Sequence, residues 1–437
     1  MKSLNVWMNG KFVGVWSVER NRHLLAYDNK WITSAEGRPL SLSMPLKDSS
    51  TPWKGDVVKN YFENLLPENI NVLKKIAEQY KTRSLEVFEI LEAIGRDCIG
   101  AVQLLPERKT PDKIKQIKGR QLKESEIAGI IKSQRISEYF SFNETDDFRI
   151  SIAGTQLKTA LLKHKNKWYI PSGQTPTTHI LKLPIAETGT VRTDFLNSVE
   201  NEWLCLKLLA HYGIPVCESE IAHFLNQKVL IVKRFDRKLS ADKKWIIRIP
   251  QEDMCQVFGI SSYKKYQSEG GPGICRIMNL LDGSRESRRD REIFFKTQIL
   301  FFLLSAIDGH AKNFSIFIEP GGRFALTPVY DVLSMHPVMG TKTGCIHPKK
   351  VKMAMAFYGK NTHYHWADIS SDHFYATAKM CGLPAESVSR ILDEIIAATK
   401  DIPNTVLKEL PDGFPENVAE SIFSGVYKSV KKIEKKL

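Results

Sequence analysis

The sequence has few features of secreted or membrane proteins. Its seven cysteines form no CxxC pair and no zinc-finger spacing with histidine, which argues against a metal cluster and a disulfide framework. No uncharged apolar run reaches the roughly 18 residues that cross a bilayer, and the longest candidate, 299–307, is too short. The N-terminal stretch has no apolar signal-peptide core. We therefore expect a cytoplasmic protein with no membrane association and with reduced, mostly buried thiols.

The composition indicates a folded protein with an excess of positive charge. An apolar fraction of 42% with 10% aromatics excludes wholesale disorder, and 437 residues are enough for two or three domains. The formal net charge of +14 indicates affinity for a polyanion. Charge alone does not separate nucleic acid from nucleotide phosphates or an acidic partner.

The first 110 residues read as a small mixed domain. Asn9-Gly10 lies between two alternating apolar stretches, which predicts a β-hairpin with a type I′ turn. The segment 38–46, RPLSLSMPL, resembles a further strand.

Along the rest of the chain, the pattern of apolar residues changes from strand-like to helical. Short β-like runs with one helical segment predict a β-rich lobe over 111–247. Residues 248–437 are predicted to form a helical lobe. Its clearest helices are expected at 292–307, 373–382 and 385–400. A β-rich lobe followed by a helical lobe is typical of kinases, which predicts that the chain carries the groups that phosphoryl transfer needs.

A polar island, DGHAKN, interrupts the apolar stretch LLSAIDGHAKNFSIF. Asp308 and Asn313 are five residues apart, as are the Asp and Asn of the protein-kinase catalytic loop. In that role Asp308 is the catalytic base, and Asn313 gives an amide oxygen to Mg²⁺. The pair alone is a weak pattern, and a capped surface loop is the alternative interpretation.

Other parts of a kinase site occur in the expected order. Asp331, downstream of Asn313, is placed to be a second Mg²⁺ ligand. Lys182 lies within an apolar strand-like run, where burial is costly unless an anion meets the charge. A helical carboxylate, Glu200 or Glu202, is a candidate partner for this lysine, although an edge-strand lysine reaching water is equally consistent. The turn of small residues at 151–159 has only one glycine and is a poor phosphate loop by itself.

Several long segments together resemble the HipA serine/threonine-kinase toxin family. The resemblance covers essentially the whole chain and rests on SIAGTQLKTALL, TPTTHILKLP, RIPQEDMCQVFG, EGGPGI, AIDGHAKNFSIF and TPVYDVLS. It implies an α+β, two-lobed protein-kinase-like fold with an extra N-terminal hairpin subdomain and an all-helical C-terminal lobe. It also implies ATP and Mg²⁺ as cofactors.

The resemblance assigns roles to individual residues. Asp308 matches the catalytic base, Asn313 and Asp331 match the Mg²⁺ ligands, and Ser151 matches an autophosphorylated serine. A phosphate on Ser151 is expected to displace the phosphate loop and switch the enzyme off. The implied ATP contacts are Ala153, Gly154, Thr155, Gln156, Leu157, Lys158, Lys182, Lys233, Arg234, Phe235, His310, Ala311, Lys312, Asn313, Tyr330 and Asp331.

The family resemblance also implies partners. It implies a protein substrate, with glutamyl-tRNA synthetase as the candidate, whose modification inhibits translation and causes growth arrest and persistence. It further implies a complex with a HipB-like helix-turn-helix antitoxin on operator DNA, with Lys379 matching a DNA contact. The sequence departs from the family at Gly382 and at Lys233, where a basic and an acidic residue are expected.

Two other functions share part of this pattern. A small-molecule phosphotransferase of the aminoglycoside or lipid-kinase type also has the D-x-x-x-x-N motif and a later Asp, but the chain-wide resemblance argues against it. A catalytically idle DNA-binding co-repressor would be free to lose Asp308 or Asp331, and this sequence keeps both.

Overall fold

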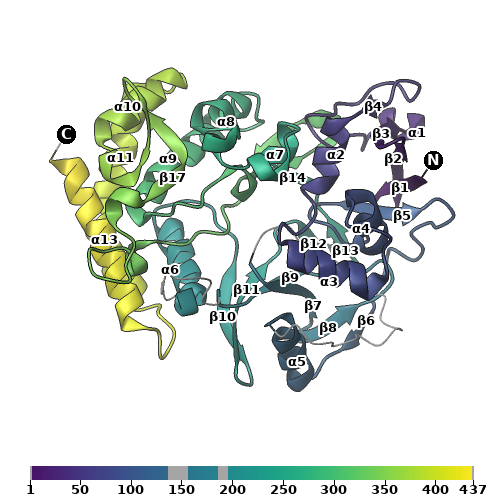
Figure 1. The fold of residues 1–437 in the computed structure, drawn as a ribbon, viewed down its shortest axis with the longest axis horizontal. Helices are drawn as coiled ribbons and strands as arrows, with labels where there is room; N and C mark the ends of the chain where they lie inside the picture. Colours follow the sequence, from purple (N-terminus) through teal and green to yellow (C-terminus); the bar gives the residue numbers. More distant parts are fainter. Residues whose placement is uncertain (1, 136–155, 186–194, 436–437) are drawn as a thin grey trace. The chain divides into compact units, whose positions relative to one another are not determined.

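The computed structural model describes residues 2–135, 156–185 and 195–435 (Figure 1). These residues form two compact units, and the chain enters each unit more than once. The first unit comprises Met1–Leu183, Ala222–Tyr263 and Ser315–Phe324. The second unit comprises Pro184–Ile221, Lys264–Phe314 and Ala325–Leu437. The three-part division at residues 110 and 247 stays a prediction.

The N-terminal part of the first unit is a five-stranded antiparallel sheet. Asn9 and Gly10 both have positive φ, 47° and 79°, so the predicted type I′ hairpin turn is confirmed. The strand order across the sheet is β4-β3-β2-β1-β5. The strands are β1 (Lys2–Met8), β2 (Lys11–Glu19), β3 (Arg22–Tyr27), β4 (Trp53–Lys54) and β5 (Val102–Pro106).

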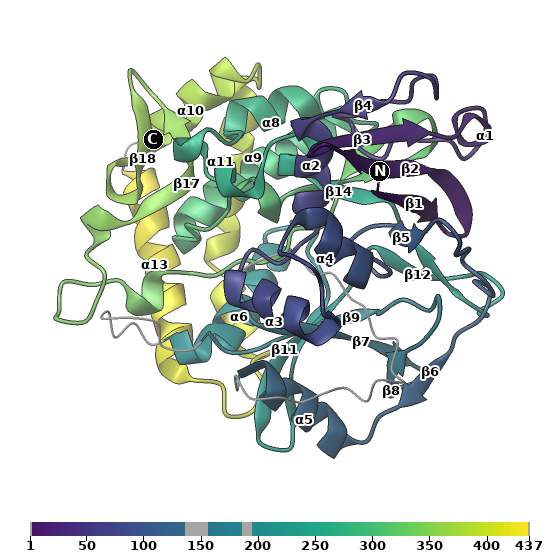
Figure 2. The same ribbon diagram turned by 45° about the vertical axis from the view of Figure 1, so that its right-hand side comes forward.

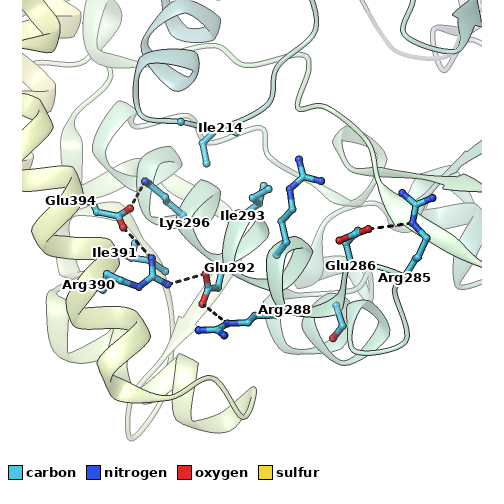
Figure 3. A pocket seen from close by; sticks show the side chains of 13 residues that line it. Ile214, Arg285, Glu286, Arg288, Glu292, Ile293, Lys296, Arg390, Ile391 and Glu394 are labelled. Atoms are coloured by element: carbon cyan, nitrogen blue, oxygen red, sulfur yellow. Dashed lines mark hydrogen bonds and ion pairs between the residues drawn. The ribbon is translucent and has the colours of Figure 1, made fainter.

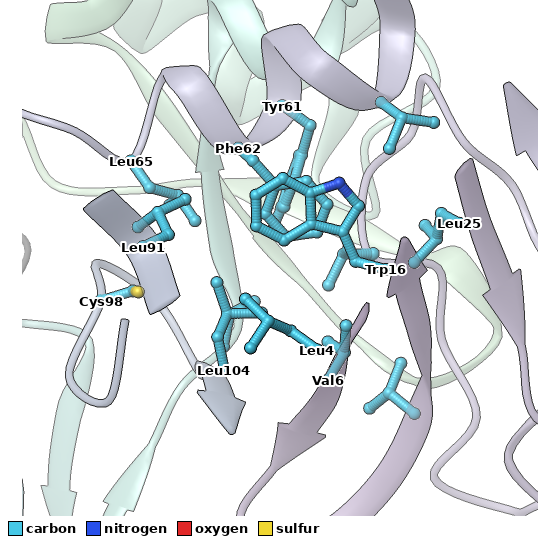
Figure 4. Packing of buried hydrophobic residues seen from close by; sticks show 14 of the residues in the cluster. Leu4, Val6, Trp16, Leu25, Tyr61, Phe62, Leu65, Leu91, Cys98 and Leu104 are labelled. Carbon is cyan, nitrogen blue, oxygen red and sulfur yellow. The ribbon is translucent and has the colours of Figure 1, made fainter. Parts of the chain in front are cut away.

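Aromatic side chains join this sheet to its helices. Trp16 on β2 is fully buried and stacks on Phe62 with 3.8 Å between ring centroids (Figure 4). Phe88 lies tilted against the same indole at 4.8 Å. Such large buried rings dominate the burial energy of a small core. The helices here are α1 (Asn29–Ile32), α2 (Asp56–Glu63), α3 (Ile70–Tyr80) and α4 (Val87–Ile94).

The segment 38–46, predicted to be a strand, is instead a turn with one isolated bridge. Pro39 and Pro45 lie in it, and proline has no N–H to donate to a strand ladder. Leu40 and Met44 are nonetheless buried in the core. The apolar pattern therefore indicated burial rather than strand structure.

A second sheet of the first unit carries several predicted ATP residues. Its order is β10-β11-β9-β7-β8-β6, and the helix α5 (Glu124–Arg135) contacts β7 and β11. Figure 2 shows β9 between β7 and β11. The strands are β6 (Gly119–Gln121), β7 (Lys158–His164), β8 (Lys167–Pro171), β9 (His179–Lys182), β10 (Ser219–Phe224) and β11 (Gln227–Lys233).

Short strands and one helix complete the first unit. β12 pairs antiparallel with β13, and β14 pairs antiparallel with β15. These elements are β12 (Arg237–Leu239), β13 (Ile246–Arg248), β14 (Gln251–Asp253), α7 (Met254–Val257) and β15 (Ser315–Ile318). The strand β16 (Phe324–Leu326) begins at the last residue of this unit and continues into the second.

The second unit is built around a long buried helix. α9 (Ser287–Leu304) packs against α6, α8 and α13, and its phenylalanines 294, 295, 301 and 302 are buried. The helices predicted at 292–307, 373–382 and 385–400 are confirmed by α9, α10 and α11. Besides α9, the helices of this unit are α6 (Ser198–His211), α8 (Ile274–Leu281), α10 (Ser371–Met380), α11 (Ala385–Thr399), α12 (Ile402–Leu407) and α13 (Glu416–Glu434).

The expectation of an all-helical C-terminal lobe needs correction. Residues 248–437 also contain strands, including the antiparallel hairpin β17 (Lys352–Tyr358) and β18 (Thr362–His365). The run MAMAF in β17 is short and continuously buried. Periodicity does not distinguish such a run from a buried helical segment. Across the described parts of the chain, no helix combines the length and apolar character needed to span a membrane.

Candidate active site

The C-terminal end of α9 determines the position of the polar loop 308–313. Ser305 follows the helix with a left-handed φ of 49°, and the N–H of Ala306 donates to the carbonyl of Phe301 at 2.8 Å. This satisfies a carbonyl at the helix end and turns the chain sharply. A Cβ on Gly309 would lie 2.4 Å from the Phe301 ring, so only glycine fits there. The loop is thus seated on the last turn of α9.

Asp308 and Asn313 meet within this loop, as the motif predicts. The Asn313 side-chain nitrogen donates to the Asp308 carbonyl at 2.8 Å, and it lies 3.5 Å from the carbonyl of Asp331. The Asp308 side chain is 55% exposed. The backbone is therefore fixed while the carboxylate faces solvent, which suits a group that must reach an external substrate.

The orientation of Asn313 leaves an oxygen available. Because its amide nitrogen points at the two carbonyls, its Oδ1 is directed elsewhere, and no described residue donates to that oxygen. The side chain is 5% exposed and therefore well ordered by packing. An amide oxygen in this position is a suitable ligand for a hard cation.

Hydrogen bonds fix the main chain before and after Asp331. Val329 donates its N–H to Pro215 at 2.8 Å and accepts from Cys217 at 2.9 Å. Beyond it, the N–H of Ser334 donates to the side chain of Asn201 at 2.8 Å. Asp331 itself has a φ of 61°, which is uncommon for a residue other than glycine. Such strained positions persist where the surroundings fix them and concentrate at functional sites.

The loop also carries two buried basic residues, His310 and Lys312. His310 is 4% exposed, and burial, with Lys265 and Lys312, lowers its pKa to about 3 against the opposing effect of Asp331. Its ring is therefore neutral at pH 7, and the 3.8 Å separation of Nε2 from the Asp308 carboxylate is no ion pair. Lys312 is also buried, and its carbonyl accepts from the Tyr330 hydroxyl at 2.8 Å.

Sequence reasoning missed the segment that faces this loop. The hydroxyl of Tyr266 donates to Oδ1 of Asp308. The Tyr266 ring lies edge-on to His310 at 5.0 Å, and the N–H of Ala311 donates to the carbonyl of Lys265 at 3.2 Å. Tyr266 therefore occupies one oxygen of the carboxylate that is predicted to act as the catalytic base. The neighbouring EGGPGI stretch was the only signal in the sequence near this contact.

In the first unit, two predicted phosphate lysines are cross-strand partners. Lys182 on β9 lies directly opposite Lys158 on β7 in antiparallel register, so their side chains share one face of the sheet. Lys182 is 6% exposed. Gln156 donates to the carbonyl of Leu183 at 2.7 Å, which fastens the start of β7 beside them. Like charges directly opposite are unfavourable unless an anion lies between them.

Arg234, a predicted ATP residue, uses its side chain internally. Its guanidinium donates to Asp236 at 3.0 and 2.8 Å and to the Cys98 carbonyl at 2.9 Å. Asp97 lies 3.6 Å away and contacts Arg237 at 3.0 Å. This buried cluster was not foreseen from the sequence. The guanidinium is thus engaged within the protein, and the predicted nucleotide contact of Arg234 stays a prediction.

The other predicted residues are dispersed. Lys233 is exposed opposite His179, and Phe235 lies edge-on to Phe317 at 5.8 Å. Lys379 is exposed on α10. Leu157 is half-buried, and Glu200 and Glu202 are buried on α6, so their predicted roles stay predictions. The remaining predicted residues lie outside the described residues: Ser151, Ala153, Gly154 and Thr155.

The predicted Mg²⁺ site uses few protein ligands. Among the described residues, no group of three or more His, Cys, Asp and Glu side chains could hold a metal ion. Mg²⁺ in kinases is bound by one or two oxygen side chains with substrate phosphates and water. The amide oxygen of Asn313 and the carboxylate of Asp331, whose main-chain carbonyl lies 3.5 Å from the Asn313 side-chain nitrogen, are ligand types that fit that arrangement.

A cleft of 590 Å³ in the second unit is a separate feature. It lies where the start of α9 faces α11, and none of the predicted site residues lines it (Figure 3). Arg390 pairs with Glu292 at 2.8 Å and with Glu394 at 3.0 Å, and Lys296 also pairs with Glu394. Each of the three carboxylates that line the cleft pairs with at least one basic side chain of the same lining, and we assign the cleft no function.

Comparison with known proteins identifies the family. Residues 4–105 match the HipA N-terminal domain, and residues 150–402 match the HipA-like C-terminal domain. The chain belongs to the HipA family. It is 29% identical to the putative kinase Y4mE of Sinorhizobium fredii, over 94% of this chain and 93% of that protein.

Two further similarities agree with this assignment. The serine/threonine-protein kinase toxin HipA of Shewanella oneidensis is 27% identical over 71% of this HipA-family chain and 69% of its own length. A chain in the structure of the Shewanella oneidensis HipA, HipB and operator DNA complex superposes with a TM-score of 0.78 at 23% identity, covering 99% of this chain and 97% of that one. The predicted two-lobed, kinase-like α+β fold is thereby confirmed.

Proposed function

We propose that this HipA-family protein is an ATP-dependent serine/threonine protein kinase that acts as the toxin of a toxin–antitoxin pair. The observation that carries the proposal is the loop in which Asn313 is fixed to the carbonyl of Asp308 while the Asp308 carboxylate stays exposed. The main chain at Asp308 is thus held by a hydrogen bond while its carboxylate is accessible to an acceptor hydroxyl.

In this proposal each group of the chain has one task. Asp308 accepts or orients the proton of the acceptor hydroxyl, and Tyr266 yields its place on that carboxylate when a substrate binds. Lys182 and Lys158 neutralise phosphate oxygens. Asn313 and Asp331 would hold Mg²⁺, which would neutralise charge at the phosphates. His310 is neutral and adds no charge to the site.

The substrate and the partners belong to the proposal. We assign glutamyl-tRNA synthetase as the candidate substrate, so that its phosphorylation inhibits translation and arrests growth in the bacterial cytoplasm. We also assign a HipB-like antitoxin and, through it, operator DNA with a contact from Lys379. Ser151 is the proposed autophosphorylation site. The support is family membership and the Shewanella oneidensis HipA, HipB and operator DNA complex.

Induced expression tests the proposal in cells. Wild type should arrest growth, Asp308→Asn should not, and Asp393→Asn, at an exposed carboxylate of α11, should behave as wild type. Phosphopeptide mapping of the lysates should find a phosphorylated tRNA synthetase only with the two active proteins. Equal arrest by all three removes the kinase-toxin function. Arrest without that phosphopeptide keeps the enzyme class and removes the substrate.

A further inference from the structure

Two cysteines far apart in the sequence touch in the second unit. The thiol of Cys381 donates to the sulfur of Cys275, with 2.9 Å between the sulfur atoms. Cys381 caps the C-terminal end of α10, and Cys275 lies in the first turn of α8. The contact joins positions 106 residues apart, so it arises from the fold rather than from local sequence.

The two thiols differ in accessibility. Cys275 is partly exposed, whereas Cys381 is buried at 4% exposure. The hydrogen bond from Cys381 lowers the pKa of Cys275, and the same bond together with burial raises the pKa of Cys381. The N-terminal turn of a helix also favours a thiolate. An accessible thiol with thiolate character beside a second thiol is the usual arrangement of a redox-sensitive pair.

The surroundings hold the pair in place. Arg291 on α9 donates to the carbonyl of Cys381 and, at 2.8 Å, to Asp282 at the end of α8. One guanidinium therefore braces the end of α10 against α8. The other cysteines among the described residues lack this setting: Cys98, Cys205, Cys217 and Cys255 are buried, and Cys345 is exposed.

We propose that Cys275 and Cys381 are a redox modification site that forms a reversible intramolecular disulfide with a peroxide as oxidant. The Cys275 thiolate attacks the peroxide, an S–O bond forms as the O–O bond breaks, and the leaving hydroxide is protonated to water. The Cys381 sulfur then attacks the sulfenic sulfur, the S–S bond forms as the S–O bond breaks, and a second water leaves with the Cys381 proton. The peroxide gains the two electrons that the two thiols lose.

The Cys275–Cys381 disulfide would lie next to the segment that contacts the loop carrying Asp308. The segment 264–273 leads directly into α8, and it contacts the loop through Tyr266 on Asp308 and through the Lys265 carbonyl. A bond from Cys275 to the end of α10 fixes the end of that segment. We therefore expect oxidation to restrict any movement of Tyr266 away from Asp308.

Mass spectrometry of the full-length protein tests the site. After brief hydrogen peroxide treatment and alkylation, unreduced digests should contain a peptide joining Cys275 to Cys381, and dithiothreitol should abolish it. The Cys345→Ser control should form the same crosslink. In Cys381→Ser, dimedone should label Cys275 as a trapped sulfenic acid, with circular dichroism confirming that the variant is folded.

Two results overturn the inference. One is the absence of the crosslinked peptide at a peroxide dose that oxidises exposed Cys345. The other is dimedone labelling of Cys275 in wild type at the same level as in Cys381→Ser, because that means Cys381 does not resolve the sulfenic acid. Neither readout uses kinase activity, so failure here is distinct from failure of the proposed function.

Discussion

Replacing Asp97 by asparagine tests the buried ion cluster that holds Arg234. The Asp97 carboxylate contacts Arg237 at 3.0 Å, Arg248 at 3.4 Å and Arg234 at 3.6 Å. Thr177 donates to it from its N–H at 2.9 Å and from its hydroxyl at 2.7 Å. All three guanidinium groups are buried. Without this carboxylate, Arg234 and Arg237 keep their contacts with Asp236, whereas Arg248 loses its ion pair with Asp97.

The magnitude follows from the pKa of Asp97. Burial by itself raises this pKa, but Arg237, Arg234 and Arg248 outweigh burial and lower it from 3.8 to about 2. That lowering corresponds to about 2 kcal/mol of stability at neutral pH. The contribution is present above pH 3.8 and is lost as the pH falls towards 2. Removing one partner of a buried ion pair typically costs about 3–5 kcal/mol, so we expect Asp97→Asn to lose about 3 kcal/mol.

Urea unfolding followed by tryptophan fluorescence measures this loss. The transition of the first unit should move to lower urea in Asp97→Asn. The control Asp242→Asn should unfold as wild type, because the side chain is exposed and asparagine keeps the oxygen that accepts from Ser240 and from the N–H of Lys244. The KM for ATP should also rise, because Arg234 is one of the predicted ATP contacts. An unfolding midpoint equal to that of the Asp242→Asn control would refute the reasoning about the cluster.

Three further predictions concern the loop and a buried acid. Gly309→Ala should lower kcat by about tenfold or more, because the added Cβ would lie 2.4 Å from the Phe301 ring and displace the loop. The control Gly129→Ala, in open space on α5, should leave kcat unchanged. Equal kcat values for the two variants would contradict this packing argument. Asn313→Leu should raise the Mg²⁺ concentration needed for half-maximal phosphoryl transfer, measured by titration, and an unchanged requirement excludes Asn313 as a ligand. Burial raises the pKa of Glu252 to about 8, so the folded protein binds a proton that the unfolded chain releases above pH 4.5, and stability should fall as the pH rises through about 8. Glu252→Gln should remove this decline in urea midpoints between pH 5 and 8, and a wild-type decline no steeper than that of the variant would contradict it.

The sequence predicted the parts of the site that are local in the chain. Asp308 and Asn313 lie on one short loop, and the apolar helix α9 before it was recognisable from its pattern. The Asn9-Gly10 hairpin was likewise set by the conformational preferences of two adjacent residues. In such cases neighbouring residues determine the geometry, so the local sequence is sufficient to predict the structure.

Long-range contacts were not predictable in this way. Tyr266 reaches Asp308 across 42 residues, Cys381 reaches Cys275 across 106, and Arg237 reaches Asp97 across 140. No spacing rule links such positions, because only the folded chain brings them together. The strand β17 was missed for another reason: a short buried apolar run does not reveal its period.

The most direct test of the central claim is transfer of the γ-phosphate of labelled ATP to protein serine by the purified protein. Wild type with Mg²⁺ should phosphorylate a protein acceptor, and Asp308→Asn should be slower by about 10²- to 10⁴-fold, the usual contribution of a general base. Asp393→Asn should match wild type. Transfer at the wild-type rate by Asp308→Asn would contradict the assignment of this loop as the catalytic centre.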